Sequence, residues 1–320
     1  MISSGQPSRA QPTAPRVRAA AVRGAGFSLP EAFWKWALLL PAVLVLGLLL
    51  IFPIIFTFVI SFTDWHLFRP NEPIAFVGLE QWRRLVTDQF ILQTLRNTLV
   101  FTAWTVPTQY LIGLAVALAL NNCTWGKKFF RVFFLMPLMI SPVAISLVIG
   151  RMIFHEDIGP LNDLIMRLGG QPVHWLTDAG LAMATLILIE VWHGTSFMIL
   201  MLMAGLQSLP QEPYESATVD GASEWQCFRY LTFPLLVPIS VTALLIRGLD
   251  AFKVVDIIKV VTGGGPGQAT ESITLAVYDI GVKGGDLAYG AAGAYTLLFA
   301  MLLFTLVVLG GTRRWVRGVS

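Results

Sequence analysis

The sequence predicts an all-α integral membrane protein that crosses the bilayer six times. Hydrophobic residues make up 55% of the 320 residues and charged residues only 13%, about half of the charged fraction that is usual in soluble domains. A soluble fold of this size could not hide so much apolar surface. The apolar residues form long continuous runs, unlike the alternating pattern of a transmembrane barrel, so helices are the expected spanning elements.

Six apolar runs are each long enough to cross about 30 Å of hydrocarbon as a helix. We place the spans at residues 37–60, 98–120, 132–150, 179–206, 230–246 and 287–312. The fifth is the shortest and carries Pro234 and Pro238, so its start is the least defined boundary. Prolines also interrupt the first and third runs, where neighbouring helices can satisfy the carbonyl groups that they free. Residues 31–320 are therefore expected to form one transmembrane domain.

The distribution of Lys and Arg predicts that both termini lie in the cytoplasm. Basic residues mark the N-terminal tail, the connection between the second and third spans and the C-terminal tail: Arg9, Arg16, Arg18, Arg23, Lys127, Lys128, Arg131, Arg313, Arg314 and Arg317. Residues 1–30 are expected to be a disordered cytoplasmic tail. A signal peptide is disfavoured because the following apolar run is too long for an h-region.

The segments expected outside the membrane are 61–96, 151–178 and 247–286, and they contain structural signals. Residues 78–86 and 159–169 each read as a short amphipathic helix. Asp250, Lys253 and Asp256 alternate in sign at helical spacing, which indicates a solvated or ion-paired face. The glycine cluster at 263–267 predicts a tight turn.

Motifs of common enzymes are absent from the sequence. No phosphate-binding loop occurs, and the glycine cluster at 263–267 is not followed by a lysine. The histidines are scattered without the spacing of a zinc helix, and no nucleophile elbow is present. The net charge of +3 is small, so nucleic acid is not an expected partner. No catalytic residue, metal site or cofactor is predicted on this chain.

The connection 207–229 is the exception to the charge pattern, because it is acidic although it is expected in the cytoplasm. It carries Glu212, Glu215, Asp220 and Glu224 against a single basic residue, Arg229. An acidic segment has the wrong charge for anionic lipid. Two interpretations remain: an ordinary amphipathic connector, or an element that docks in a groove of a basic cytoplasmic protein.

The residues of this connection predict a short surface helix. Pro213 can start a helix, acidic residues favour its first turn, and Gly221 interrupts or ends it. A second helical piece then leads through Pro234 into the fifth span.

Glu190, Trp192 and His193 are the candidate solute-pathway residues of the fourth span. An ionised carboxylate within a membrane is costly, so it usually faces a cavity or a partner. Glu190 and His193 are three positions apart and share a helix face, whereas Trp192 lies on a neighbouring face. Two interpretations stay open: a polar lining or charge relay for a hydroxyl-rich solute, or a bond from Glu190 to another helix that holds the bundle together.

The acidic connection also carries a motif with a fixed spacing. Its residues are Glu215, Ser216 and Ala217, then Gly221 after three positions, and beyond nine more positions Leu231, Phe233 and Pro234. This motif resembles the pattern Glu-Ala-Ala-x3-Gly-x9-Ile-x-Leu-Pro of binding-protein-dependent ABC importer permeases, with three conservative departures. Tyr214 and the stretches 76–80, 97–102, 129–137, 204–207, 219–222 and 262–267 are similar to the carbohydrate-uptake branch of these permeases, the maltose and glycerol-3-phosphate type.

The resemblance implies a six-span subunit of type I importer architecture in a bacterial cytoplasmic (inner) membrane. It implies a second related permease, a dimer of ATPase subunits that carries ATP and Mg, and an extracytoplasmic binding protein that delivers a sugar, polyol or glycoside. The residues of the coupling loop held by the ATPase would be Tyr214, Glu215, Ser216, Ala217, Asp220, Gly221 and Pro234. The residues facing the binding protein would be Asp250, Asp256, Gly264, Gly265 and Pro266.

A proton-coupled secondary transporter that uses Glu190 and His193 is the alternative from another class. Such carriers usually have more spans with inverted repeats, and no internal repeat is visible here. An intramembrane enzyme ranks third. No residue in the sequence selects one sugar or polyol.

Overall fold

A computed structural model describes residues 31–123 and 126–317 of the chain, so the expected tail at 1–30 lies outside the described residues. In the described part there is no β-strand, and helices account for the elements. The α-helices are α1 (Glu31–Leu46), α2 (Phe52–Ile60), α3 (Glu80–Thr87), α4 (Gln89–Asn122), α5 (Lys127–Leu135), α6 (Pro142–Ile145), α7 (Pro160–Arg167), α8 (Ala179–Gln207), α9 (Glu212–Val219), α10 (Glu224–Cys227), α11 (Phe233–Phe252), α12 (Asp256–Val261), α13 (Ile273–Tyr278) and α14 (Leu287–Arg317). Shorter turns complete them: π-helical turns at Gly47–Ile51, Ser146–Ile153, Phe228–Thr232 and Asp279–Lys283, and a 3₁₀ turn at Met136–Met139.

The chain divides into two compact units, residues 1–53 and 54–320. In the first unit, no described side chain between residues 35 and 53 is buried. Nearly every one of these side chains is apolar, which is the surface that lipid stabilises and water does not. The second unit contains all of the candidate functional residues.

The predicted all-α membrane architecture is confirmed. Five described stretches are long and apolar enough to cross a membrane: Lys35–Ile60, Gln89–Asn122, Ala179–Gln207, Glu224–Val261 and Leu287–Thr312. A bent pair, Lys127–Met139 and Pro142–Ile153, makes a sixth crossing if it is counted as one span.

Two predicted spans differ from the structure in detail. The run at 132–150 is not one straight helix, because the chain bends by 94° between Met139 and Pro142. Pro142 has no N–H for a continuing helix, which explains the break at that point. The fifth helix extends beyond the expected end at 246, since α11 continues to Phe252. Arg247 and Asp250, expected in an outer segment, are therefore helical.

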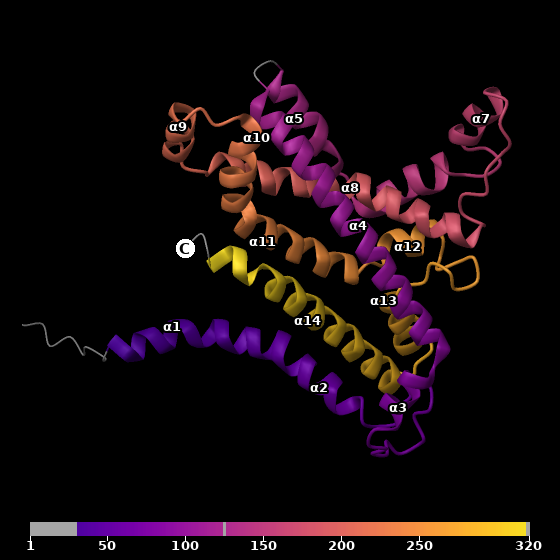
Figure 1. Cartoon of the computed structure of the whole chain (residues 1–320). Coiled ribbons are helices and arrows are strands. Elements are labelled where there is room, and N and C mark those ends of the chain that lie inside the picture. The colour runs from indigo at the N-terminus through magenta and orange to yellow at the C-terminus, as the bar shows by residue number, and fades with distance from the viewer. Residues whose placement is uncertain (1–30, 124–125, 318–320) are drawn as a thin grey trace, which may run out of the picture. The chain divides into compact units, whose positions relative to one another are not determined.

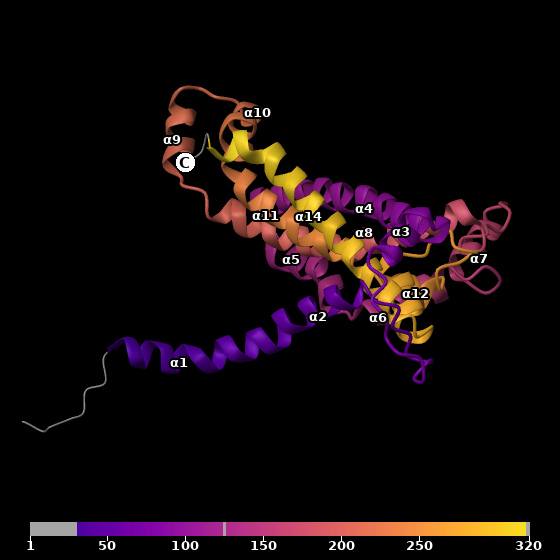
Figure 2. The ribbon, with the colours of Figure 1, turned by 90° about the horizontal axis from the view of Figure 1, so that it is seen from below.

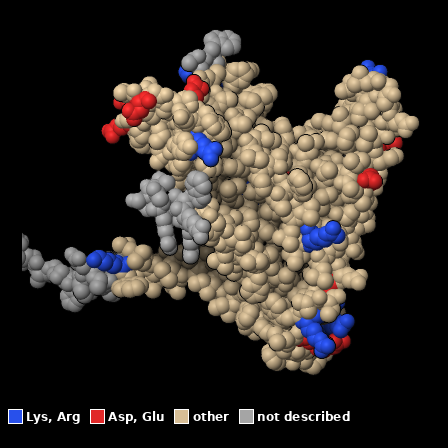
Figure 3. Space-filling view, in the orientation of Figure 1, with Lys and Arg blue, Asp and Glu red and all other residues tan. Residues whose placement is uncertain are grey.

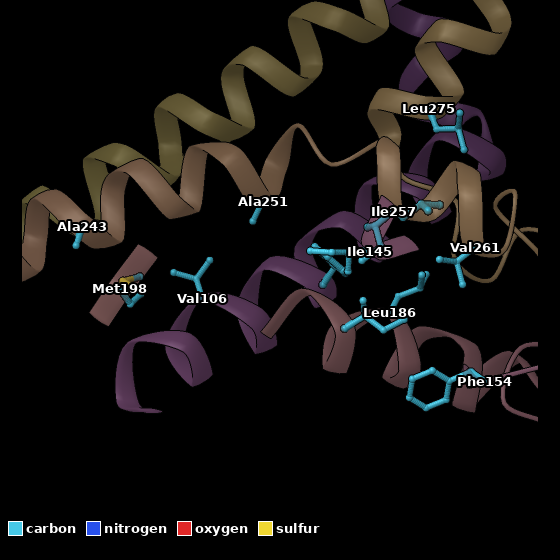
Figure 4. Packing of buried hydrophobic residues seen from close by; sticks show 13 residues of the cluster. Val106, Ile145, Phe154, Leu186, Met198, Ala243, Ala251, Ile257, Val261 and Leu275 are labelled. Atoms are coloured by element: carbon cyan, nitrogen blue, oxygen red, sulfur yellow. The ribbon is translucent and has the colours of Figure 1, made fainter. Parts of the chain in front are cut away.

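The core of the second unit is a bundle in which α4, α8, α11 and α14 pack side by side (Figure 1). Close approach is possible because glycines lie at the contacts: Gly113 of α4 faces Met198, and Gly248 of α11 faces Phe304. Figure 4 shows apolar residues of α4, α8, α11 and α12 pointing toward one another, among them Val106 and Leu186.

The two expected amphipathic helices outside the spans are confirmed. The first is α3, which buries Gln81 and Leu85. The second is α7, which begins with Pro160 and buries Asn162. Within the second unit, α9 and α10 lie at one end of the bundle, and α7 and α12 lie at the opposite end (Figures 1 and 2). The charge pattern assigns the first end to the cytoplasm and the second to the outside.

Candidate functional site

The acidic connection folds as predicted into a surface helix, α9. Pro213 occupies its first turn, where the missing N–H is not needed, and Glu212 and Glu215 lie beside the positive end of the helix dipole. The side chains of Glu212, Glu215, Ser216 and Asp220 are exposed. Figure 3 shows acidic side chains gathered over this end of the molecule. The segment therefore offers a negative, protruding surface.

A sharp turn ends α9, and Gly221 makes it possible. Gly221 has φ +77°, a left-handed conformation that most residues other than glycine and asparagine adopt only with strain. The backbone N–H of Ala222 bonds to the carbonyl of Ala217, which satisfies an end of the helix. Directly afterwards, Ser223 and Gln226 form a capping box that starts α10. The shape of the segment is thus set by local residues.

The segment continues into the membrane without a break. A π-helical turn, Phe228–Thr232, joins α10 to α11, and Pro234 lies in the first turn of α11. Proline cannot donate to the carbonyl four residues earlier, which fits the irregular turn immediately before it. The expected helical passage through Pro234 is confirmed.

A cavity of about 980 Å³ lies between this segment and the bundle. Its lining includes Leu118 and Asn122 at the end of α4, Leu206 at the end of α8, and Tyr214 and Phe228 of the segment. The helix α9 therefore stands away from the bundle and does not pack directly on it.

The second candidate, Glu190, lies in the interior of the bundle and has a partner, Arg247, that was not predicted. Arg247 of α11 donates from Nη2 to Oε1 of Glu190 on α8. Nε of Arg247 donates to Oε1 of Gln109 on α4 at 3.1 Å, and Nε2 of Gln109 donates to the carbonyl of Glu190 at 2.8 Å. The three side chains join three helices in one polar cluster.

The expected pairing of Glu190 with His193 is present but looser. Nδ1 of His193 lies 4.0 Å from Oε2 of Glu190, and both side chains are about 14% exposed or less. Trp192 does not join this cluster, since it is on another face and 44% exposed. The structure thus brings Glu190 and His193 together and leaves Trp192 apart.

A signal for Arg247 was available in the sequence. The predicted fifth span was unusually short, and one more residue would have included an arginine. An arginine in a membrane helix requires a buried partner, and Glu190 was the obvious acid. Gln109 gave no comparable signal, because a neutral amide within a span is less costly.

The glycine cluster forms the expected turn, with Gly263, Gly264 and Gly267 in left-handed conformations. The amide of Asn97 on α4 donates to the carbonyls of Gln268 and Glu271 at 2.9 and 3.1 Å. The turn is therefore tied to the bundle.

The candidates for facing a binding protein are unequally accessible. Asp250 and Asp256 are exposed, Gly265 and Pro266 are half-buried, and Gly264 is buried against Glu271. The expected ion-paired face is present, since Nζ of Lys253 lies 3.6 Å from Asp250.

At the same end of the molecule, Glu156 organises the residues around α7. Its carboxylate accepts hydrogen bonds from the backbone N–H groups of Leu176 and Thr177 and from the hydroxyl of Thr177, and it lies 3.1 Å from Nδ1 of His174. Burial raises the pKa of Glu156, but the bonds from His174, Thr177 and Leu176 outweigh it and lower the pKa to about 2. This carboxylate is ionised at neutral pH.

No group of three or more metal-ligating side chains occurs in the part of the chain that the structure describes.

Comparisons with known proteins all point to one family. The family described as "Binding-protein-dependent transport system inner membrane component" matches residues 109–320. The trehalose/maltose transport system permease protein MalF of Thermococcus litoralis is 36% identical over 279 residues, which cover 87% of this chain and 93% of that protein. The sulfoquinovosyl glycerol transport system permease protein SmoG of Agrobacterium fabrum is 34% identical over 275 residues, covering 85% and 88%.

A solved structure shows the same fold. It is the bacterial alginate ABC transporter in complex with an alginate pentasaccharide-bound periplasmic protein. One of its chains superposes with a TM-score of 0.76 at 21% identity, over 89% of this chain and 95% of that chain.

Proposed function

Because the chain belongs to the family of binding-protein-dependent transport system inner membrane components, we propose that it moves a sugar, polyol or glycoside into the cell with energy from a separate ATPase. As a member of this family it is a transport permease subunit of an ABC importer, and a multi-pass protein of the cytoplasmic membrane. The solute, the partners and the roles of individual residues are the content of the proposal.

The observation that carries the proposal is the form of α9. It is a short helix with an exposed acidic face, it stands over a cavity, and its chain continues directly into the membrane helix α11. A connector that only reversed the direction of the chain would not need a helix held away from the bundle by a cavity. A helix presented in this way suits a groove in a partner with basic side chains, which we take to be an ATPase subunit.

The partners of the proposed complex are a second, related permease, two ATPase subunits and an extracytoplasmic solute-binding protein. ATP and Mg would bind on the ATPase. The binding protein would meet the outer end, at Asp250, Asp256 and the turn of Gly264, Gly265 and Pro266. The exposure of both aspartates supports that placement.

The proposed mechanism is alternating access. ATP draws the ATPase subunits together, the docked α9 moves with them, and the membrane helices swing between inward- and outward-open states around a cavity near the midplane. The names of the trehalose/maltose and sulfoquinovosyl glycerol relatives support a hydroxyl-rich solute. Glu190, Trp192 and His193 remain the candidates for its path.

A proton relay through Glu190 and His193 is less well supported than it was by sequence alone. Glu190 already bonds to Arg247, so a relay through its carboxylate would first have to break that contact. The contact between Arg247 and Glu190 therefore favours the interpretation in which Glu190 holds the bundle together.

Two measurements test the proposal. The first is purification of the chain from native membranes, where we expect an ATPase and a second permease to accompany it. The second uses Gly221→Val in the assembled complex. A β-branched residue is strained at φ +77°, so α9 should lose its orientation, and ATP hydrolysis stimulated by loaded binding protein should disappear.

The control is Gly221→Asn at the same position. Asparagine tolerates the left-handed conformation, and a Cβ atom there meets nothing within 4 Å, so most of the stimulated hydrolysis should remain. Full stimulation in Gly221→Val, or purification of the chain without partners, contradicts the proposed function.

A further inference from the structure

One side-chain hydrogen bond joins α9 to the residue that precedes the membrane helix α11. Oη of Tyr214, in α9, lies 3.0 Å from Oγ1 of Thr232, the last residue of the π-helical turn before α11. Both side chains are partly buried. The contact closes the intervening chain, with α10 inside it, into a ring.

Other hydroxyl groups of α9 do not reach outward. Ser216 donates to the carbonyl of Glu212, and Thr218 donates to the carbonyl of Tyr214, both within α9. Among the described residues, the bond to Thr232 is the one side-chain hydrogen bond that leaves this helix.

The cavity leaves this hydrogen bond as a direct contact through which a movement of α9 can reach the membrane helices. Tyr214, Thr218 and Thr232 all line the cavity of about 980 Å³ that separates α9 from the bundle. Packed protein transmits displacement because its interior has few voids, and here that packing is missing. A push on α9 could be absorbed by movement into the cavity unless a direct contact opposes it.

Thr232 directly precedes α11, so a contact with its side chain acts on the start of that membrane helix. Its hydroxyl also lies 3.4 Å from the carbonyl of Cys227, five residues earlier, across the π-helical turn. Single π-helical turns within helices are frequent at functional sites. From Thr232 the chain runs directly into α11, which carries Arg247 of the buried cluster.

We propose that the hydrogen bond between Tyr214 and Thr232 is a strut that passes the movement of α9 to α11. The resemblance groups Tyr214 with the residues held by the ATPase, but its side chain is half-buried and its hydroxyl bonds to Thr232. In this proposal Tyr214 and Thr232 are positioning residues for transport, and the exposed acidic side chains of α9 meet the ATPase. This inference rests on the proposed function, in which α9 is the docking element. Loss of this hydrogen bond should weaken the coupling between ATP hydrolysis and transport: ATP is hydrolysed, but less solute moves for each ATP.

The test uses the complete complex in proteoliposomes with loaded binding protein. Tyr214→Phe and Thr232→Val each remove one hydroxyl, and we expect solute moved per ATP to fall roughly fivefold, the factor that one ordinary hydrogen bond supplies to an equilibrium. Thr232→Ser keeps the hydroxyl and should keep the ratio. The double variant should fall no further than either single variant, because both remove the same contact.

Thr305→Val is the matched control. This hydroxyl in α14 bonds only within its own helix, to the carbonyl of Met301, so the transport ratio should be unchanged. A wild-type ratio in Tyr214→Phe, or losses that multiply in the double variant, overturns the strut. If Gly221→Val leaves stimulated ATP hydrolysis intact, the docking role itself fails. If Tyr214→Phe keeps the wild-type amount of solute moved per ATP while Gly221→Val loses stimulated ATP hydrolysis, the strut is disproved and the docking role of α9 stands.

Discussion

Arg247 of α11 and Glu190 of α8 form an ion pair inside the helix bundle, with the side chains only 10% and 13% exposed. Gln109 of α4 holds the guanidinium from a third helix. Neither charge could remain in this environment alone, because an unpaired charge in a membrane interior is costly. The pair therefore fixes how α8 and α11 meet.

Removing one member of this pair should destabilise the protein more than removing both. Glu190→Leu or Arg247→Met leaves a buried charge without its partner, which costs about 3–5 kcal/mol. Replacing both charges with apolar side chains is often nearly neutral, so the double variant should recover most of the loss. Thermal unfolding in detergent measures this. A double variant as unstable as either single variant would show that the pair is not the cause.

Space at Gly194 is the second requirement of the cluster. A Cβ atom at this position would collide with Nη2 of Arg247 and Nε2 of Gln109. We expect Gly194→Ala to lower the unfolding temperature and reduce uptake. Gly310→Ala is the control, because a Cβ there meets nothing within 4 Å and alanine favours a helix. If the two variants show the same unfolding temperature and uptake, the contact of Gly194 with the polar cluster is not important for either.

Asn97 should hold the outer glycine turn in place. Its amide reaches the carbonyls of Gln268 and Glu271, and Asn97→Leu leaves both acceptors without that donor. Hydrogen exchange in residues 262–271 should become faster, and the binding protein should stimulate ATP hydrolysis less. Thr296→Val in α14, whose hydroxyl bonds within its own helix, is the control. Unchanged exchange in Asn97→Leu would contradict this role.

The outer segment around α7 should lose stability in acid. The pKa of Glu156 is about 2 in the folded protein against an ordinary 4.5. Its contribution is therefore complete above about pH 4.5 and is lost as the pH falls toward 2, at most about 3 kcal/mol. Hydrogen exchange of residues 156–178, corrected for intrinsic rates, measures it.

Glu156→Gln should show the weakened segment already at neutral pH and lose this acid dependence. Glu72→Gln is the control, because Glu72 makes only an exposed pair with Arg69. An acid dependence that persists in Glu156→Gln assigns the effect to another group.

Local signals in the sequence predicted the segments whose shape depends on near neighbours. The apolar runs predicted the membrane helices because hydrocarbon requires continuous apolar surface over a whole helix. Pro213 and Gly221 predicted the limits of α9, since each acts on its own backbone. The motif from Glu215 to Pro234 carried the family resemblance, which the matched family confirmed.

Contacts between distant parts of the chain could not be predicted in the same way. Arg247 was expected outside the membrane, because the predicted span was ended at the last apolar residue before this charge. Its place inside the bundle depends on Glu190, 57 residues away, and Gln109, 138 residues away. The bend in the third span has a local cause, Pro142, but the sequence did not predict it because proline is often tolerated within membrane helices.

The sequence by itself determined an all-helical membrane permease and the position of the acidic surface helix α9, because hydrophobic runs and turn residues act locally. Only the tertiary structure decided which polar side chains meet: Arg247 with Glu190 in the core, and Tyr214 with Thr232 at the wall of the cavity. The physical reason is that a buried polar group takes whichever partner the packing of the helices brings within hydrogen-bonding distance, and no local pattern records that choice.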